Sequence, residues 1–207
     1  MRGFKMYCTK DEIKAFNKIT YEDLGYASET AFDTFLDSLI LQAQGLIENY
    51  CNAPIGFFDA AGKAFTNQLY DYKYPWIDLR YYPVVSVSKI EYNDQGYGIA
   101  ANWVTLAAID YILNLDTGQL MLVNKTPAIP EQSVRVSYTA GYASVPTAVK
   151  HVCIQICTNS LQEILQRKVN PVSRIDDFSL KVIFPDVFTR ELQVMLTPFI
   201  RKMVACG

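Results

Sequence analysis

Few residues in this sequence have side chains suited to bond-making chemistry, and those present stand apart from one another. The single histidine, His151, has no second histidine or paired cysteine at ligand spacing, so zinc has no plausible set of ligands. Cys153 and Cys157 are four residues apart on one predicted helix, where buried thiols acting as small hydrophobic side chains are favoured. Asp176 and Asp177 are adjacent in a predicted loop and should point apart, which favours a solvated turn over an acid–base pair. We therefore expect no catalytic residue, metal or cofactor.

Motifs that bind phosphate or activate a serine are missing as well. The sequence contains no G-x-x-x-x-G-K-[ST], no G-x-G-x-x-G and no G-x-S-x-G. The prediction is a protein without enzymatic activity, with a small hydrolase of unconventional site as a remaining alternative.

The amino-acid composition is that of a chain that can fold around a hydrophobic core. Of its 207 residues 50% are hydrophobic and 19% charged, which excludes a disordered chain, and the net charge of −2 argues against a broadly cationic nucleic-acid binder. No apolar run approaches the roughly 20 residues of a membrane span, and the first residues lack the apolar stretch of a signal peptide. Five widely spaced cysteines without a C-x-x-C argue against a secreted disulfide framework. We expect a soluble, intracellular protein that does not bind a membrane.

Helical periodicity is confined to the two ends of the chain. Thr9 and Glu12 have the spacing of a capping box at the start of a short helix, and Ser28 is a fitting N-cap for a long one that runs to Tyr50. Pro146 opens a third helix that reaches about residue 167, and a fourth follows Asp186. Leu39 and Ile40 of the second helix are predicted to pack on Ile156 and Leu161 of the third.

The middle of the chain has the pattern of short strands separated by turns. Asp116, Thr117 and Gly118 suit a hairpin loop, because glycine accepts the positive φ that such a loop needs. Six or seven mostly antiparallel strands would form a small sandwich or open barrel, and residues 178–184 are either one more strand or an extended arm. The predicted strands are 65–72, 77–80, 84–92, 103–106, 111–115, 119–123 and 133–139.

These elements predict an α+β fold. The terminal helices form a small helical bundle, and a β-rich sandwich or open barrel is inserted between the second and third helices. The expected domains are a discontinuous helical domain, residues 1–52 and 143–207, and a β-rich subdomain, residues 53–142.

Aromatic residues are concentrated in one short stretch of the β-rich part. They suit a sheet core, a protein interface, or a platform that stacks on sugars or bases. Nucleic acid is the least favoured partner, since only Lys73 and Arg80 supply positive charge there. The residues are Tyr70, Tyr72, Tyr74, Trp76, Tyr81 and Tyr82.

Four sequence stretches, in this order, resemble the head-to-tail connector proteins of tailed bacteriophages, also called adaptor or head-completion proteins. The second helix ends in Leu46–Cys51 (LIENYC), and a strand reads Leu79–Ile90 (LRYYPVVSVSKI). The most specific stretch is Val134–Tyr142 (VRVSYTAGY), followed by Val-Pro and a long helix. The last is Leu196–Arg201 (LTPFIR).

The resemblance implies a structural protein of the virion neck, between capsid and tail, assembled in the host bacterial cytoplasm. It implies a homo-oligomeric ring, twelvefold on the portal, that binds the portal protein on one side and a stopper or tail-terminator protein on the other. DNA would pass through the channel without sequence-specific binding. A carbohydrate-binding or host-recognition module using the tyrosine-rich β part is the alternative.

The segment from Arg190 to Lys202 is the predicted portal-binding element. Pro198 should end the helix before it and release an arm with apolar anchors and basic residues, whereas folding of Phe199 and Ile200 onto the helical core is the competing interpretation. The candidate portal contacts are Arg190, Leu196, Pro198, Phe199, Ile200, Arg201 and Lys202. The candidate inter-subunit contacts are Tyr72, Tyr74, Trp76, Tyr81 and Tyr82.

Overall fold

The computed structural model describes residues 6–59, 62–72, 75–169 and 187–201, without the side chains of 166–169. Contacts divide the chain into two compact units. The helical unit contains Met1–Cys51 and Val145–Ile200, and the β unit contains Asn52–Ser144 and Arg201–Gly207. Among the described residues, Arg201 groups with the β unit.

The first two helices begin at the caps that the sequence predicted. Helix α1 covers Lys10–Asn17, where Thr9 Oγ1 accepts from the Glu12 amide at 3.2 Å and Glu12 Oε2 accepts from the Thr9 amide at 3.0 Å. Helix α2 covers Glu29–Tyr50 and begins with the Ser28 hydroxyl accepting from the Ala31 amide. These side-chain acceptors satisfy amides that have no partner inside a helix, and they fix where each helix starts.

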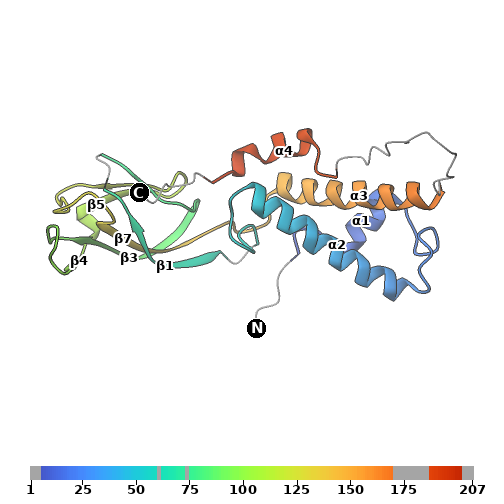
Figure 1. Cartoon of the computed structure of the whole chain (residues 1–207), viewed down its shortest axis with the longest axis horizontal. Helices are drawn as coiled ribbons and strands as arrows, with labels where there is room; N and C mark the ends of the chain where they lie inside the picture. The colour runs from blue at the N-terminus through green and yellow to red at the C-terminus, as the bar shows by residue number, and fades with distance from the viewer. Residues whose placement is uncertain (1–5, 60–61, 73–74, 170–186, 202–207) are drawn as a thin grey trace, which may run out of the picture. The chain divides into compact units, whose positions relative to one another are not determined.

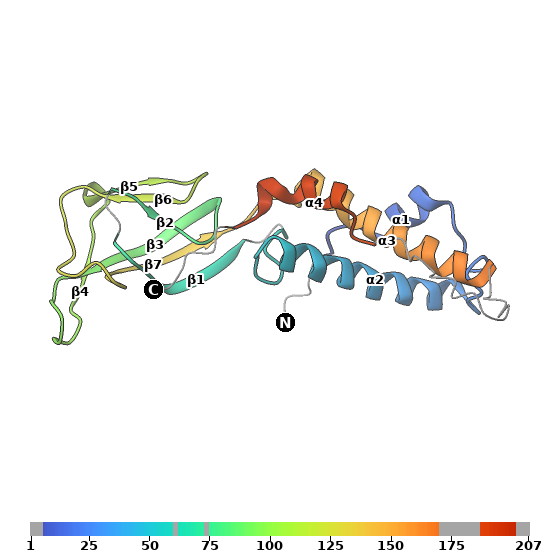
Figure 2. The same cartoon turned by 45° about the horizontal axis from the view of Figure 1, so that its top comes forward.

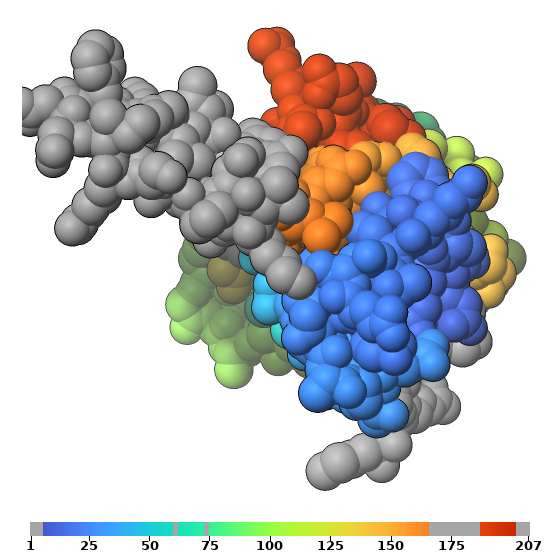
Figure 3. All heavy atoms as spheres, turned by 90° about the vertical axis from the view of Figure 1, so that its right-hand side faces the viewer, coloured from blue at the N-terminus to red at the C-terminus, as the bar shows by residue number. Residues whose placement is uncertain are grey.

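The helical unit is completed by α3, Thr147–Val169, and α4, Arg190–Leu196, which continues into the 3₁₀ turn η2, Thr197–Phe199. Helix α2 packs on α3, and α1 and α4 also pack on α3. Figure 3 shows α4 in red against α3 in orange, with the blue N-terminal helices beside them. The core contains Phe32, Leu36, Leu39, Ile40, Ala43 and Ile47 of α2 and Val149, Val152, Cys153, Ile156, Cys157 and Leu161 of α3.

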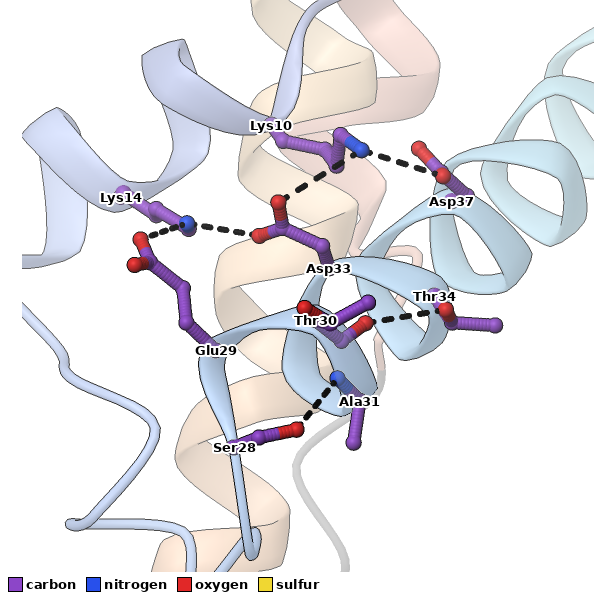
Figure 4. A network of polar contacts seen from close by, with 9 residues as sticks. All are labelled: Lys10, Lys14, Ser28, Glu29, Thr30, Ala31, Asp33, Thr34 and Asp37. Atoms are coloured by element: carbon purple, nitrogen blue, oxygen red, sulfur yellow. Dashed lines mark hydrogen bonds and ion pairs between the residues drawn. The ribbon is translucent and has the colours of Figure 1, made fainter.

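Lysines of α1 and acidic residues of α2 hold these two helices together (Figure 4). Lys14 Nζ lies 2.8 Å from Glu29 and 2.6 Å from Asp33, and Lys10 Nζ lies 3.3 Å from Asp37. The pKa of Lys14 is raised because Asp33 and then Glu29 accept hydrogen bonds from its ammonium group. The network fixes α1 on α2 at their water-exposed edge.

All seven predicted strands are present in the β unit, in two antiparallel sheets (Figure 1). The large sheet has the order β1-β7-β3-β4 and the small sheet the order β2-β6-β5. The turn between β5 and β6 places Gly118 at a φ of 68°, as the hairpin prediction required. The strands are β1 Lys63–Tyr70, β2 Ile77–Asp78, β3 Val84–Asn93, β4 Trp103–Thr105, β5 Tyr111–Asn114, β6 Gln119–Leu122 and β7 Val134–Ala140.

The small sheet lies on one side of the large one, as Figure 2 shows. Between them the hydroxyls of Tyr70 and Tyr138 lie 2.9 Å apart, and the backbone amides of Arg80 and Tyr81 donate to these hydroxyls at 3.3 and 3.2 Å. Val134 and Val136 share the Tyr138 side of β7 and are fully buried. The β unit is thus a two-layer sandwich within an α+β chain, which confirms the predicted fold class. The predicted strand at 178–184 lies outside the described residues.

Candidate partner-binding surfaces

Helix α4 presents one exposed face and one buried face. Leu192 and Leu196 are buried in the helical unit, while Arg190, Val194 and Met195 are exposed, Val194 at 63%. The regular α-helix ends at Leu196 and the chain continues through the 3₁₀ turn Thr197–Phe199, in which Thr197, the residue before Pro198, keeps helical backbone angles (φ −49°, ψ −42°). A partner can therefore reach the face formed by Arg190, Val194 and Met195 without unfolding the helix.

The residues after α4 are less accessible than an open arm would be. Pro198 is exposed, whereas Phe199 and Ile200 are half-buried. Arg201 is only 2% exposed, and Lys202 lies outside the described residues. Two of the candidate portal contacts, Leu196 and Arg201, are thus buried within the protein itself in this structure.

Arg201 occupies a cage of aromatic rings in the β unit. Its guanidinium carbon lies 5.0 Å from the ring centre of Phe57, 4.5 Å from that of Tyr82 and 5.8 Å from that of Tyr142. Its Nη2 donates to the Tyr142 hydroxyl at 2.6 Å, while its buried Nε has no hydrogen-bond partner among the described residues. Ring faces carry partial negative charge, so the cage stabilises a cation that has no carboxylate partner in the described part of the chain.

The clustered tyrosines mostly serve the β unit itself. Tyr70 is buried, Tyr81 stacks on Phe65 with ring centres 4.3 Å apart, and Tyr82 covers Arg201. Tyr72 is half-buried, Trp76 is 41% exposed, and Tyr74 lies outside the described residues. The described rings do not form one row of exposed platforms, so core packing accounts for much of the aromatic density.

The cysteines lie mainly in the core of the helical unit. Cys8, Cys51, Cys153 and Cys157 are buried free thiols, and Cys206 lies outside the described residues. Cys8 Sγ lies 3.5 Å from Cys153 Sγ. The pKa of the Cys153 thiol is raised, first because its contacts with Cys157 and Cys8 favour the protonated form and then because burial disfavours a thiolate. The pKa of the Cys8 thiol is instead lowered to about 4, first by its contact with Cys153 and then by that with Cys157. All four thiols are buried, in line with a packing role.

The outer face of the large sheet carries a charged cluster that the sequence analysis did not identify. Glu91 of β3 and Arg135 of β7 are cross-strand partners, and Arg135 Nε donates to Glu91 Oε2 at 2.7 Å. Lys89 Nζ lies 2.6 Å from the other carboxylate oxygen. The Arg135 guanidinium stacks on Trp103, 4.4 Å from its ring centre. The pKa of Glu91 is lowered, mainly because Arg135 donates this hydrogen bond.

The outer face of the small sheet is apolar and was also missed. Ile112 of β5 is 51% exposed and pairs with Met121 of β6. Ile109, in the 3₁₀ turn Ala108–Asp110 before β5, and Val123, directly after β6, are 80% and 46% exposed. The alternation in β5 and β6 was a usable signal, but alternation by itself does not tell which face meets the other sheet.

The described residues contain no group of three or more His, Cys, Asp or Glu side chains placed to hold a metal ion. Within the same residues, no helix is long and apolar enough to cross a membrane.

The Head completion protein family matches residues 9–159, which include α1, α2, all seven strands and the first half of α3. The chain belongs to this family. Membership makes it a structural head completion protein of a phage-type particle. The resemblance drawn from the sequence motifs is thereby confirmed.

Two solved structures from gene transfer agent (GTA) particles are similar to this chain. One is a chain of the neck of an empty GTA particle computed with C6 symmetry, with 18% identity, coverage of 95% of this chain and 91% of that chain, and a TM-score of 0.49. The other comes from the virion of a native GTA particle, with the same identity and coverage and a TM-score of 0.46. No curated protein matches the chain.

Proposed function

We propose that this protein forms a ring in the neck, binds the portal protein on one side and a stopper or tail-terminator protein on the other, and surrounds the DNA channel without reading sequence. The observation that carries the proposal is the family match over residues 9–159. The net charge of −2 is compatible with DNA passage, because a strongly cationic channel would retain the phosphate backbone. No catalytic activity is part of the proposal.

The ring is proposed to have the twelvefold symmetry of the portal on which it assembles. The free protein should be a monomer or a weak oligomer, and addition of the cognate portal should convert it to a discrete ring. Mass measurement of the portal-bound complex and counting of its subunits in projection images test this. A tight dimer that ignores the portal would contradict the proposal.

Residues 190–202 are proposed to be the main portal-binding element. In the described part, the exposed face of α4 supplies apolar anchors in Val194 and Met195 next to the cation of Arg190. A few apolar anchors with a flanking charge are typical of energetically dominant interface residues. This segment lies outside the family match, so its role depends on its own chemistry.

Val194→Asp tests this element with little risk to folding, since Val194 is 63% exposed. The variant should keep its melting temperature and lose co-sedimentation with the portal. Leu41→Asp is the matched control, because Leu41 is an apolar residue of α2 with 50% exposure. Equal portal binding by V194D and wild type would exclude the exposed face of α4 as the contact.

The tyrosine-rich part is proposed to contribute inter-subunit contacts through its accessible rings, Tyr72 and Trp76, with Tyr74, Tyr81 and Tyr82 as the remaining candidates. Trp76→Ala should weaken ring formation while the isolated chain stays folded. A glycan-binding screen addresses the alternative role of this region in carbohydrate or host recognition, and the connector proposal expects no binding.

A further inference from the structure

Four apolar residues lie on or next to the outer face of the small sheet, hereafter the small-sheet face. They are Ile109, Ile112, Met121 and Val123. Ile112 and Met121 are direct cross-strand partners. Val123 is two residues beyond Met121, on the same side of the strand, and its amide donates to the Asp110 carbonyl at 2.9 Å, next to Ile109.

Such a patch differs from the scattered apolar residues of ordinary protein surfaces. Ile109, Ile112 and Val123 expose 80%, 51% and 46% of their surface. Single exposed apolar residues need no explanation, but adjacent ones on a sheet indicate an interaction site. The strand β5 beneath the patch ends the order β2-β6-β5, so its outer side has no neighbouring strand among the described residues.

Negative charge prevails around this face. Asp110 precedes β5 and Asp116 follows it, and neither forms an ion pair within the described part of the chain. Asp78 of β2 lies on the same side, opposite Gln119. Lys125 is exposed two residues after Val123, and Arg80 follows Asp78 by two residues.

The opposite side of the sandwich, hereafter the large-sheet face, has the complementary charge. It carries Lys89 and Arg135 around a single carboxylate, that of Glu91. The Glu91 side chain is 4% exposed, whereas those of Lys89 and Arg135 are 47% and 23% exposed, so the cations are what a partner meets. Leu69 pairs with Arg135 from β1 and adds an apolar contact that is 42% exposed.

We propose that, in the ring, the small-sheet face of one copy packs on the large-sheet face of the next copy. This contact depends on the ring that the proposed function requires. The two faces point in opposite directions, because they are the outer sides of a two-layer sandwich (Figure 2). A contact between different faces of identical chains is heterologous, and it repeats around a closed ring. The apolar patch meets Leu69 and Trp103, and the acidic rim meets Lys89 and Arg135.

Ile112→Asp and Ile109→Asp place a charge in the small-sheet face at two positions that do not support the fold. Both variants should remain folded and fail to form the portal-templated ring. Ile99→Asp is the matched control, since Ile99 is 62% exposed in the loop between β3 and β4, and it should assemble as wild type does. Assembly of both I112D and I109D at wild-type level would overturn the contact.

Single cysteines identify which face meets which. In a Cys206→Ser background, a mixture of I112C and L69C treated with a short bis-maleimide should give a covalent dimer, and the double variant I112C/L69C should give a ladder of oligomers. I112C alone should give no dimer, and neither should a mixture of I99C and L69C. A dimer from I112C alone would show like faces in contact and would overturn the proposal.

The two proposals fail differently. A wild-type chain that forms no ring on the portal would contradict the proposed function and remove the basis of the contact. A wild-type ring without cross-links between positions 112 and 69 would overturn the contact and leave the connector function standing.

Discussion

The Nη2 atom of Arg201 donates a hydrogen bond to the Tyr142 hydroxyl at 2.6 Å, which joins the last described residue of the chain to the segment that precedes α3. Arg201 follows α4 and η2 in sequence, yet its contacts are with the β unit. Arg201 is therefore packed within the β unit, whereas Leu192 and Leu196 before it are buried in the helical unit.

Arg201→Ala should destabilise the β unit by about 2 kcal/mol, because it removes a desolvated cation–π contact and a charged hydrogen bond. Arg201→Lys should recover only part of this, since an ammonium group is not planar and does not stack on rings as a guanidinium does. Chemical denaturation measures both. Arg190→Ala, which changes an exposed arginine of α4, is the control and should stay within about 0.5 kcal/mol of wild type. Equal stability of R201A and R190A would show that the cage contributes nothing.

Leu39→Ala should cost about 2 to 5 kcal/mol, because Leu39 is 6% exposed on the face of α2 that packs on α3. Leu41→Ala, two residues further on the same helix, removes an equal volume from a side chain that is 50% exposed and should cost far less. Thermal unfolding of the two variants gives the comparison. An unchanged melting temperature for L39A would mean that α2 is not buried at this position.

Glu91→Gln should weaken the acid sensitivity of the β unit. The pKa of Glu91 is lowered in the folded chain, chiefly by Arg135, so the ion pair stabilises the fold above the ordinary carboxyl pKa and this stabilisation is lost as pH falls through the folded pKa. At pH 7 the variant should be less stable by about 1 to 3 kcal/mol. Its unfolding curve should converge with that of wild type in acid. A difference that stays constant between pH 7 and pH 3 would assign the loss to packing instead.

The buried thiols should resist alkylation in the native protein. All four thiols are buried, which keeps a reagent in solution away from them. Contacts with Cys157 and Cys8 and then burial raise the pKa of Cys153, whereas contacts with Cys153 and Cys157 lower the pKa of Cys8 to about 4, so protection depends on burial. In a Cys206→Ser variant, an aromatic disulfide reagent should release almost no colour until denaturant is added, and then titrate four thiols. Rapid reaction of one thiol in the folded variant would show that the core around Cys8 and Cys153 opens.

Local signals in the sequence were sufficient for the elements and their ends. The capping box of Thr9 and Glu12, the Ser28 cap and the glycine at 118 each act within a few residues, and the structure has them where they were expected. The alternating strands were found for the same reason, because one buried face imposes period two on any strand. The family assignment also came from short motifs in a fixed order.

The tertiary structure decided which residues are exposed for partners and whether Arg201 is buried. A basic residue after a proline near the chain end looks accessible in sequence, but Arg201 is buried by Phe57, Tyr82 and Tyr142, which are distant along the chain. Likewise, the pairing of Glu91 with Arg135 and the outward direction of Ile112 follow from strand order and register. Local patterns fix φ and ψ and the periodicity of burial, whereas strand order and sheet stacking decide which faces are covered and which remain for partners.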